Sequence, residues 1–211
     1  MNRKSSVLAL VGIAAGLLTS PTPAFADSKP SPAHKKVRVT TVEVPFSSIK
    51  DFTGWVRVDW GPGFPAEGIR HEDATEPIST PDPTALKAAK SVGYVCSLYV
   101  SQANYVGDDE VIQVNTTGSC SGAFVKQETE LKFQWDEDGG YWGWEDWTGW
   151  TKGGWSSSAN DENRFQVDCD GGGWYYYRGV GRQTAQSSED LSYHTGPDVY
   201  GNYASYRSNC G

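Results

Sequence analysis

The chain has 211 residues, nine of them tryptophan, and a formal net charge of −8. This negative charge repels phosphate backbones, so the composition argues against sequence-independent binding to nucleic acid. No stretch reaches the roughly 20 apolar residues that a membrane-spanning helix needs, so we expect no membrane span.

Residues 1–26 have the features of a secretory signal peptide. Arg3 and Lys4 precede an apolar stretch from Val7 to Leu18, and Ala24-Phe25-Ala26 has the small-x-small form that signal peptidase accepts. A membrane anchor is the alternative, but the apolar stretch is too short for one. We therefore expect a secreted, extracellular protein whose mature chain begins at Asp27.

Residues 27–50 form a basic segment that we expect to be poorly ordered. Its cationic residues are Lys29, Lys35, Lys36, Arg38 and Lys50. A solvated linker is the preferred interpretation, and a tail that binds the acidic domain or an anionic cell wall is the alternative. The partial alternation from Val37 to Val44 can add one strand.

Residues 51–91 are predicted to be a proline-rich extension. Phe52 to Trp60 alternates as a strand does, and residues 61–83 are typical of a long loop. Thr84 to Ser91 is rich in alanine and lysine and predicts a short helix, which Gly93 would terminate.

Residues 92–211 predict an antiparallel β-sandwich domain. In the clearest strand, Leu131, Phe133 and Trp135 share one face with Thr129, and charged or amide side chains occupy the other. Short strands separated by turn residues are typical of a sandwich. The strands are expected at Val95–Val100, Val111–Asn115, Ala123–Trp135, Arg164–Asp168, Trp174–Val180 and Tyr203–Ser208, with a long loop over 181–199.

The chain has four cysteines, and an even number in an exported protein indicates disulfides. Three connectivities are possible, and we favour Cys96–Cys120 and Cys169–Cys210 because these are sequence neighbours. A zinc site usually needs closely spaced cysteine pairs, which this sequence lacks. We therefore expect no metal and no cofactor.

Several of these features together resemble a family of small secreted β-sandwich proteins of actinobacteria. The features are Leu131-x-Phe133-x-Trp135, Trp142-x-Trp144, the strand Tyr175 to Arg178, the paired cysteines and the terminal Ser208 to Gly211. The resemblance covers residues 94–211. It implies a secreted sandwich and carries no shared activity.

Six of the nine tryptophans lie between Trp135 and Trp155, separated by glycines and acidic residues. We expect about half of them, beginning with Trp135, to fill the core. Exposed indole rings near carboxylates suit sugar binding, and tryptophan is also frequent at protein interfaces and at membrane surfaces. The predicted binding residues are Trp142, Trp144, Trp147, Trp150, Glu145 and Asp146.

The sequence indicates no catalytic residue. His194 lies in a segment with loop composition, and no serine carries a nucleophile motif: Gly118 to Gly122 fails the G-x-S-x-G spacing. Asp136-x-Asp138-Gly139 is a fragment of a calcium loop, but an acidic β-turn is the preferred interpretation.

The leading hypothesis is therefore a secreted, non-catalytic binding module for carbohydrate or a cell-envelope component. The first alternative is an inhibitor or antagonist of an extracellular enzyme or a competing cell, acting through the Cys96–Cys120 loop or the 181–199 loop. The second is a glycoside hydrolase that uses carboxylates near the tryptophans.

Overall fold

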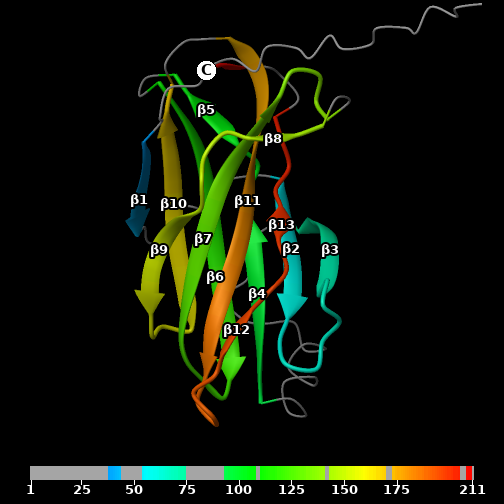
Figure 1. The fold of residues 1–211 in the computed structure, drawn as a ribbon, viewed down its shortest axis with the longest axis vertical. Helices are drawn as coiled ribbons and strands as arrows, with labels where there is room; N and C mark the ends of the chain where they lie inside the picture. Colours follow the sequence, from blue (N-terminus) through cyan, green and yellow to red (C-terminus); the bar gives the residue numbers. More distant parts are fainter. Residues whose placement is uncertain are drawn as a thin grey trace, which may run out of the picture. The chain divides into compact units, whose positions relative to one another are not determined.

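The computed structural model describes residues 38–43, 54–74, 93–107, 110–140, 143–169, 173–204 and 208–210. Within these ranges the chain is all-β, without a helix, and forms two sheets of seven strands each (Figure 1). The predicted fold class, an antiparallel β-sandwich with two disulfides, is confirmed. The predicted signal peptide and the predicted helix at Thr84–Ser91 lie outside the described residues.

The first sheet contains every described strand that precedes β7, together with β10. Its order is β1 (Val39–Glu43), β10 (Asn160–Asp168), β6 (Val111–Gly122), β4 (Tyr94–Val100), β2 (Trp55–Trp60) and β3 (Ile69–Ala74), and β5 (Asn104–Val106) also pairs with β6. The central strand β6 is buried along Val111–Cys120, so both of its faces are covered.

The second sheet is built on two long neighbouring strands, β7 (Phe124–Asp136) and β11 (Trp174–Ser187). Short strands pair with their outer edges. These are β8 (Glu145–Asp146) and β9 (Thr151–Ser156) on β7, and β12 (Tyr193–Thr195), β13 (Val199–Tyr200) and β14 (Ser208–Asn209) on β11.

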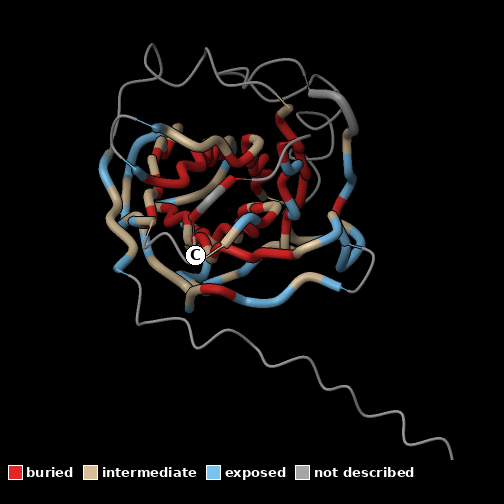
Figure 2. Tube along the Cα trace, turned by 90° about the horizontal axis from the view of Figure 1, so that it is seen from above, coloured by how far each residue is buried: buried red, intermediate tan, exposed pale blue. Residues whose placement is uncertain are grey.

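The hydrophobic core lies between the two sheets. Leu131, Phe133 and Trp135 are buried, as their alternation in the sequence predicts, and they pack with residues of the first sheet such as Val114. Figure 2 looks along the strands and shows buried segments at the centre and exposed segments at the periphery. Burial of these large side chains is the main term that stabilises the sandwich.

Two glycines of β11 let the sheets approach closely. A Cβ at Gly179 would lie 2.7 Å from Cγ1 of Val114, and a Cβ at Gly181 would lie 2.5 Å from Cγ2 of Val100. No side chain fits at these distances without moving its neighbours. The glycines are therefore required by the packing of the two sheets.

Both disulfides have the predicted connectivity. Cys96 and Cys120 are paired positions of β4 and β6, so their bond joins neighbouring strands. Cys169 follows β10 and Cys210 follows β14, so their bond joins the first sheet to the second. The two bonds indicate that the protein folds in an oxidising compartment.

Three expectations about organisation differ from the structure. The sandwich begins before residue 92, because β2 lies between β3 and β4 and because β1 pairs with β10. The predicted loop 61–83 contains β3, whose residues include no proline. The predicted loop 181–199 contains the second half of β11, all of β12 and the first residue of β13.

Candidate ligand-binding site

Five of the six predicted binding residues lie in the described ranges, and they do not form one surface. Trp142 lies outside those ranges. Trp147 is only 9% exposed and belongs to the hydrophobic core, where its ring centroid lies 5.0 Å from that of Tyr177. The prediction that Trp147 contacts a ligand is therefore wrong: its ring faces the space between the sheets, which needs large side chains.

Three other tryptophans of the segment lie against cations of β7 and β11. Trp155 contacts Lys126, Trp150 contacts Lys132 and Arg182, and Trp144 contacts Arg178, with 4.2 to 5.2 Å between cation and ring centroid. We call these seven residues the tryptophan–cation ladder. Each such contact contributes about 0.5–1 kcal/mol at an exposed site, so the ladder holds the segment against the sheet.

The glycine spacing of the segment has a local cause. Gly143 and Gly154 have φ values of 100° and 103°, which strongly favour glycine, and they directly precede Trp144 and Trp155. The chain therefore turns immediately before each of these two rings, and each ring then contacts a cation of the sheet.

Arg178 is held by two aromatic rings and one hydrogen bond. Its guanidinium carbon lies 4.3 Å from the ring centroid of Trp144 and 4.8 Å from that of Tyr200. Its Nε donates a 2.9 Å hydrogen bond to Oε1 of Gln134, the residue opposite it on β7. Burial lowers the pKa of Arg178, and the positive charge of Arg70 lowers it further.

An open depression of about 400 Å³ lies beside Arg178. We call it the Arg178 depression, and its lining residues are Arg70, Arg178, Tyr200, Gly201, Asn202 and Tyr203. Tyr200 and Tyr203 are 38% and 42% exposed, so their rings are accessible. Tyr203 also contacts Trp144, with 5.3 Å between ring centroids, and so connects the depression to the tryptophan segment.

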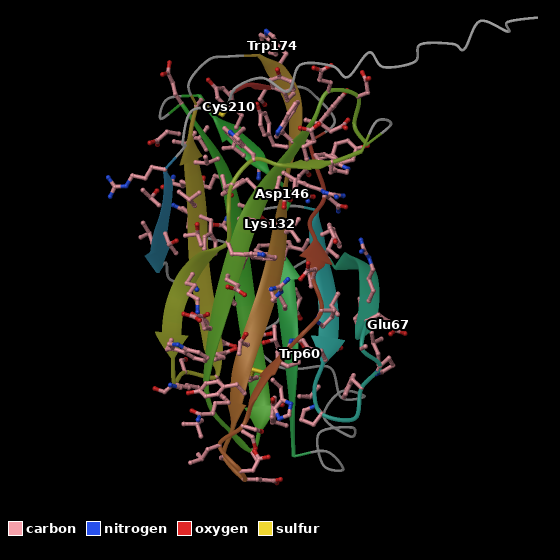
Figure 3. The ribbon with its side chains drawn as sticks, viewed as in Figure 1. Trp60, Glu67, Lys132, Asp146, Trp174 and Cys210 are labelled. Atoms are coloured by element: carbon pink, nitrogen blue, oxygen red, sulfur yellow. A yellow bond between two sulfur atoms is a disulfide. The ribbon has the colours of Figure 1, made fainter. Side chains whose placement is uncertain are left out.

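The two predicted carboxylates have different surroundings. Glu145 is exposed on β8. Asp146 accepts hydrogen bonds from Nζ of Lys132 at 2.8 Å and from Nε2 of Gln134 at 2.7 Å, and its ion pair with Lys132 lies over β7 (Figure 3). Partial burial opposes its ionisation, but these bonds and the charges of Lys132 and Arg178 hold its pKa below the usual range. A glycosidase general acid needs a raised pKa, which Asp146 lacks.

Comparisons with known proteins give no family. No protein-family model matches the chain, and searches of curated proteins and of solved structures find no match. The described part of the chain holds no helix of the length and apolarity that crossing a membrane requires. In the same ranges, no group of three or more His, Cys, Asp or Glu side chains could hold a metal ion.

The fragment Asp136-x-Asp138-Gly139 forms a turn. Oδ1 of Asp136 accepts hydrogen bonds from the backbone N–H groups of Asp138 and Gly140, both at 2.7 Å. An aspartate that accepts N–H groups two and four residues later stabilises a tight turn. Asp136 is also only 3% exposed, so its carboxylate is part of the fold and ends β7.

Ser192 and His194 approach each other, but not in the order that activates a serine. Oγ of Ser192 lies 2.7 Å from Nε2 of His194 and donates to Oδ1 of Asp190 at 2.6 Å. In a hydrolytic triad the histidine lies between the serine and the carboxylate. Here the serine lies between them, and its proton is directed to Asp190, whose pKa is lowered by hydrogen bonds from Ser192. Such a carboxylate is a weak base.

The other serine near an acid and a histidine belongs to a structural network. Asp59 on β2 accepts two hydrogen bonds from Arg57 at 2.8 Å each and one from Ser97 at 2.5 Å, and it lies 2.9 Å from Nε2 of His71. Arg57, Asp59 and Ser97 are each at most 6% exposed. The network neutralises a buried carboxylate, as a buried charge requires.

Sequence reasoning missed most of the depression. Arg70 belongs to the segment that was predicted as a long loop. Tyr200 and Asn202 lie just after the predicted loop 181–199. The useful signal was the strand Tyr175 to Arg178, because an arginine among aromatics on an exposed strand face is a frequent recognition element. The partners of Arg178 come from distant segments, which spacing in the sequence does not show.

Proposed function

We propose that this protein is a secreted, non-catalytic binding protein that holds a saccharide of a polysaccharide or cell envelope in the Arg178 depression. The proposal is supported by one observation: the lining of this open depression combines accessible aromatic rings with polar groups of fixed orientation. Ligand sites commonly combine apolar or aromatic walls with a few polar groups of fixed orientation.

The rings supply the apolar part of the proposed contact. Tyr200 and Tyr203 line the depression, and Trp144 lies next to Tyr203. Tyr203 also contacts Tyr176 of β11, with 5.5 Å between ring centroids. Aromatic neighbours on both sides hold this ring in place, which reduces the entropy that ligand binding would cost.

The polar groups that line the depression are also held in place by neighbouring residues. Nδ2 of Asn202 donates a 3.0 Å hydrogen bond to the carbonyl oxygen of Gly54, and the Asn202 backbone accepts a hydrogen bond from Ala103. Arg178 is held by Gln134 and by two rings. Preformed polar groups of this kind give orientation and specificity to a bound sugar.

The test uses the mature protein, from Asp27 onward, and measures its retention on insoluble polysaccharides and on a glycan array. Tyr200→Ala and Tyr203→Ala should weaken binding at least about tenfold, because each removes an aromatic ring that lines the depression. Trp155→Ala is the matched control, because this exposed tryptophan belongs to the ladder but does not line the depression. Absence of binding to every saccharide, or equal losses in all three variants, would contradict the proposal.

A further inference from the structure

We infer that the ligand of the Arg178 depression carries an oxyanion, such as the carboxylate of a uronic acid or the phosphate of a phosphate-linked polymer, and that Arg178 and Arg70 bind this group. The inference deepens the proposed function and rests on it for the saccharide part. The oxyanion part stands on the arrangement of charges around Arg178.

Among the residues that the structure describes, Arg178 has no acidic partner in direct contact. Its one side-chain hydrogen bond goes from Nε to Gln134, and its terminal amino groups make no hydrogen bond or ion pair with any described residue. Asp136 and Asp146 favour its charged form only as neighbouring charges. Half-buried cations in proteins are normally paired, since removing a charge from water is costly.

Two other arginines of the sandwich show the usual arrangement. Arg57 binds both carboxylate oxygens of Asp59 at 2.8 Å. Arg182, four residues after Arg178 on the same strand, binds Oδ1 of Asp198 at 2.7 Å and also contacts a tryptophan ring. Arg178 therefore differs from Arg182, because no described carboxylate binds it.

The orientation of Arg178 suits a bidentate anion. Its planar guanidinium is in contact with Trp144 and Tyr200, and Gln134 occupies Nε. The terminal amino groups remain for a ligand, and Arg178 lines the depression. A guanidinium with fixed orientation matches the two oxygens of a carboxylate, phosphate or sulfate, and such charge-assisted bonds are stronger than neutral ones.

A second cation, Arg70, also lines the Arg178 depression, and none of the six lining residues is acidic. Arg70 comes from β3 in the first sheet and Arg178 from β11 in the second, yet both line the depression. The six lining residues include no aspartate or glutamate, although the whole chain has a net charge of −8. A second positive charge at the depression favours an anionic ligand over a neutral one.

The experiment compares matched polymers by isothermal titration calorimetry with the mature protein. The carboxylate arm uses polygalacturonate and its methyl ester, which share one sugar backbone and differ in having a carboxylate or a neutral methyl ester, and the phosphate arm uses poly(glycerol phosphate). Arg178→Met and Arg70→Met remove the proposed contacts, and Arg178→Lys keeps the charge but not the planar fork. Arg182→Met is the control on the same strand.

A second measurement does not depend on a saccharide. Sodium glucuronate, inorganic phosphate and inorganic sulfate are titrated while the arginine Nε–Hε and tryptophan indole N–H resonances are followed by NMR. The inference expects shifts at Arg178 and Trp144 and none at Arg182 or Trp155. This titration also covers the case in which Arg178→Met fails to fold.

The outcomes separate the two proposals. The charged polymer should bind at least about tenfold more tightly than its neutral ester, with Arg178→Met losing this preference and Arg182→Met retaining it. Equal binding of acid and ester would overturn the oxyanion inference and leave the proposed function standing. Anion shifts at Arg178 without binding of any polymer would support the oxyanion site and overturn the saccharide proposal. No polymer binding and no shifts would overturn both.

Discussion

The indole nitrogen of Trp60 in β2 donates a hydrogen bond of 2.9 Å to Oε1 of Gln183 in β11. This bond joins the two sheets inside the sandwich. Nε2 of Gln183 in turn donates to Oε1 of Gln127, and Nε2 of Gln127 donates to the carbonyl oxygens of Ser158 and Ala159. The network runs from the first sheet through the second to the turn before β10.

Trp60→Phe should lower the free energy of unfolding by about 1–3 kcal/mol, because it leaves the oxygen of buried Gln183 without its indole donor. Urea unfolding followed by circular dichroism measures this change. Trp155→Phe, which alters an exposed ring, should change stability by about 0.5 kcal/mol or less. An equal effect of the two substitutions would show that the buried hydrogen bond contributes nothing measurable.

Tyr94 makes the stability of the protein sensitive to alkaline pH. Burial raises its pKa to about 12, and the charge of Asp190 acts in the same direction. The unfolded chain loses this proton near pH 10, so the folded state binds more protons between pH 10 and 12 and stability falls as pH rises through this window. The fall attributable to Tyr94 should reach about 2–3 kcal/mol above pH 12.

Tyr94→Phe should therefore match the wild type within about 1 kcal/mol at pH 7 and exceed it in stability at pH 11.5. Urea midpoints at the two pH values provide the comparison, and the difference spectrum at 295 nm between wild type and variant locates the titration. A tyrosinate difference signal that appears near pH 10 would contradict the raised pKa of about 12.

Truncation of Trp147 should reduce stability and truncation of Trp144 should reduce binding, although the two residues lie only three positions apart in the sequence. Trp147→Ala removes a buried ring that contacts Phe133 and Tyr177, so it should destabilise the fold by about 3–5 kcal/mol. Trp144→Ala should leave the urea midpoint nearly unchanged and reduce ligand binding. If Trp147→Ala folds normally and loses binding, the core position of this ring is excluded.

Gly181 is needed for the close approach of the sheets. Gly181→Ala places a Cβ 2.5 Å from Cγ2 of Val100 and should cost about 1–3 kcal/mol through overpacking. Gly149→Ala is the matched control, because a Cβ there meets no atom within 4 Å and the substitution should be nearly neutral. Thermal melts of both variants decide between a packing role and a merely local preference for glycine.

The parts of the fold that depend on local alternation could be predicted from the sequence. Leu131, Phe133 and Trp135 repeat with a period of two on a strand with one buried face, so their side was predictable. The disulfide pairing followed from the order and spacing of the four cysteines. Both kinds of signal lie within a few tens of residues along the chain, and both were confirmed.

The same reasoning failed where distant segments decide the structure. The strand from Trp174 was predicted to end at Val180, but it continues to Ser187, and Gly179 and Gly181 pack against Val114 and Val100 of the other sheet. Likewise, Trp147 and Trp150 carry the same side chain in the same kind of segment, but Trp147 packs on Phe133 and Tyr177 in the core, whereas Trp150 packs on the cations Lys132 and Arg182. The Arg178 depression is lined by residues of β3, β11 and β13, and no local sequence pattern predicts that these strands come together.

The outer edges of the second sheet are divided among short strands. Along β11 the edge consists of β12, β13 and β14, of three, two and two residues, and along β7 it consists of β8 and β9, of two and six. A long uninterrupted edge offers a row of unpaired N–H and C=O groups on which another molecule can add a strand. Because each edge is broken into short segments, the second sheet presents no long continuous row of unpaired backbone groups there, and this disfavours intermolecular sheet growth of the amyloid kind.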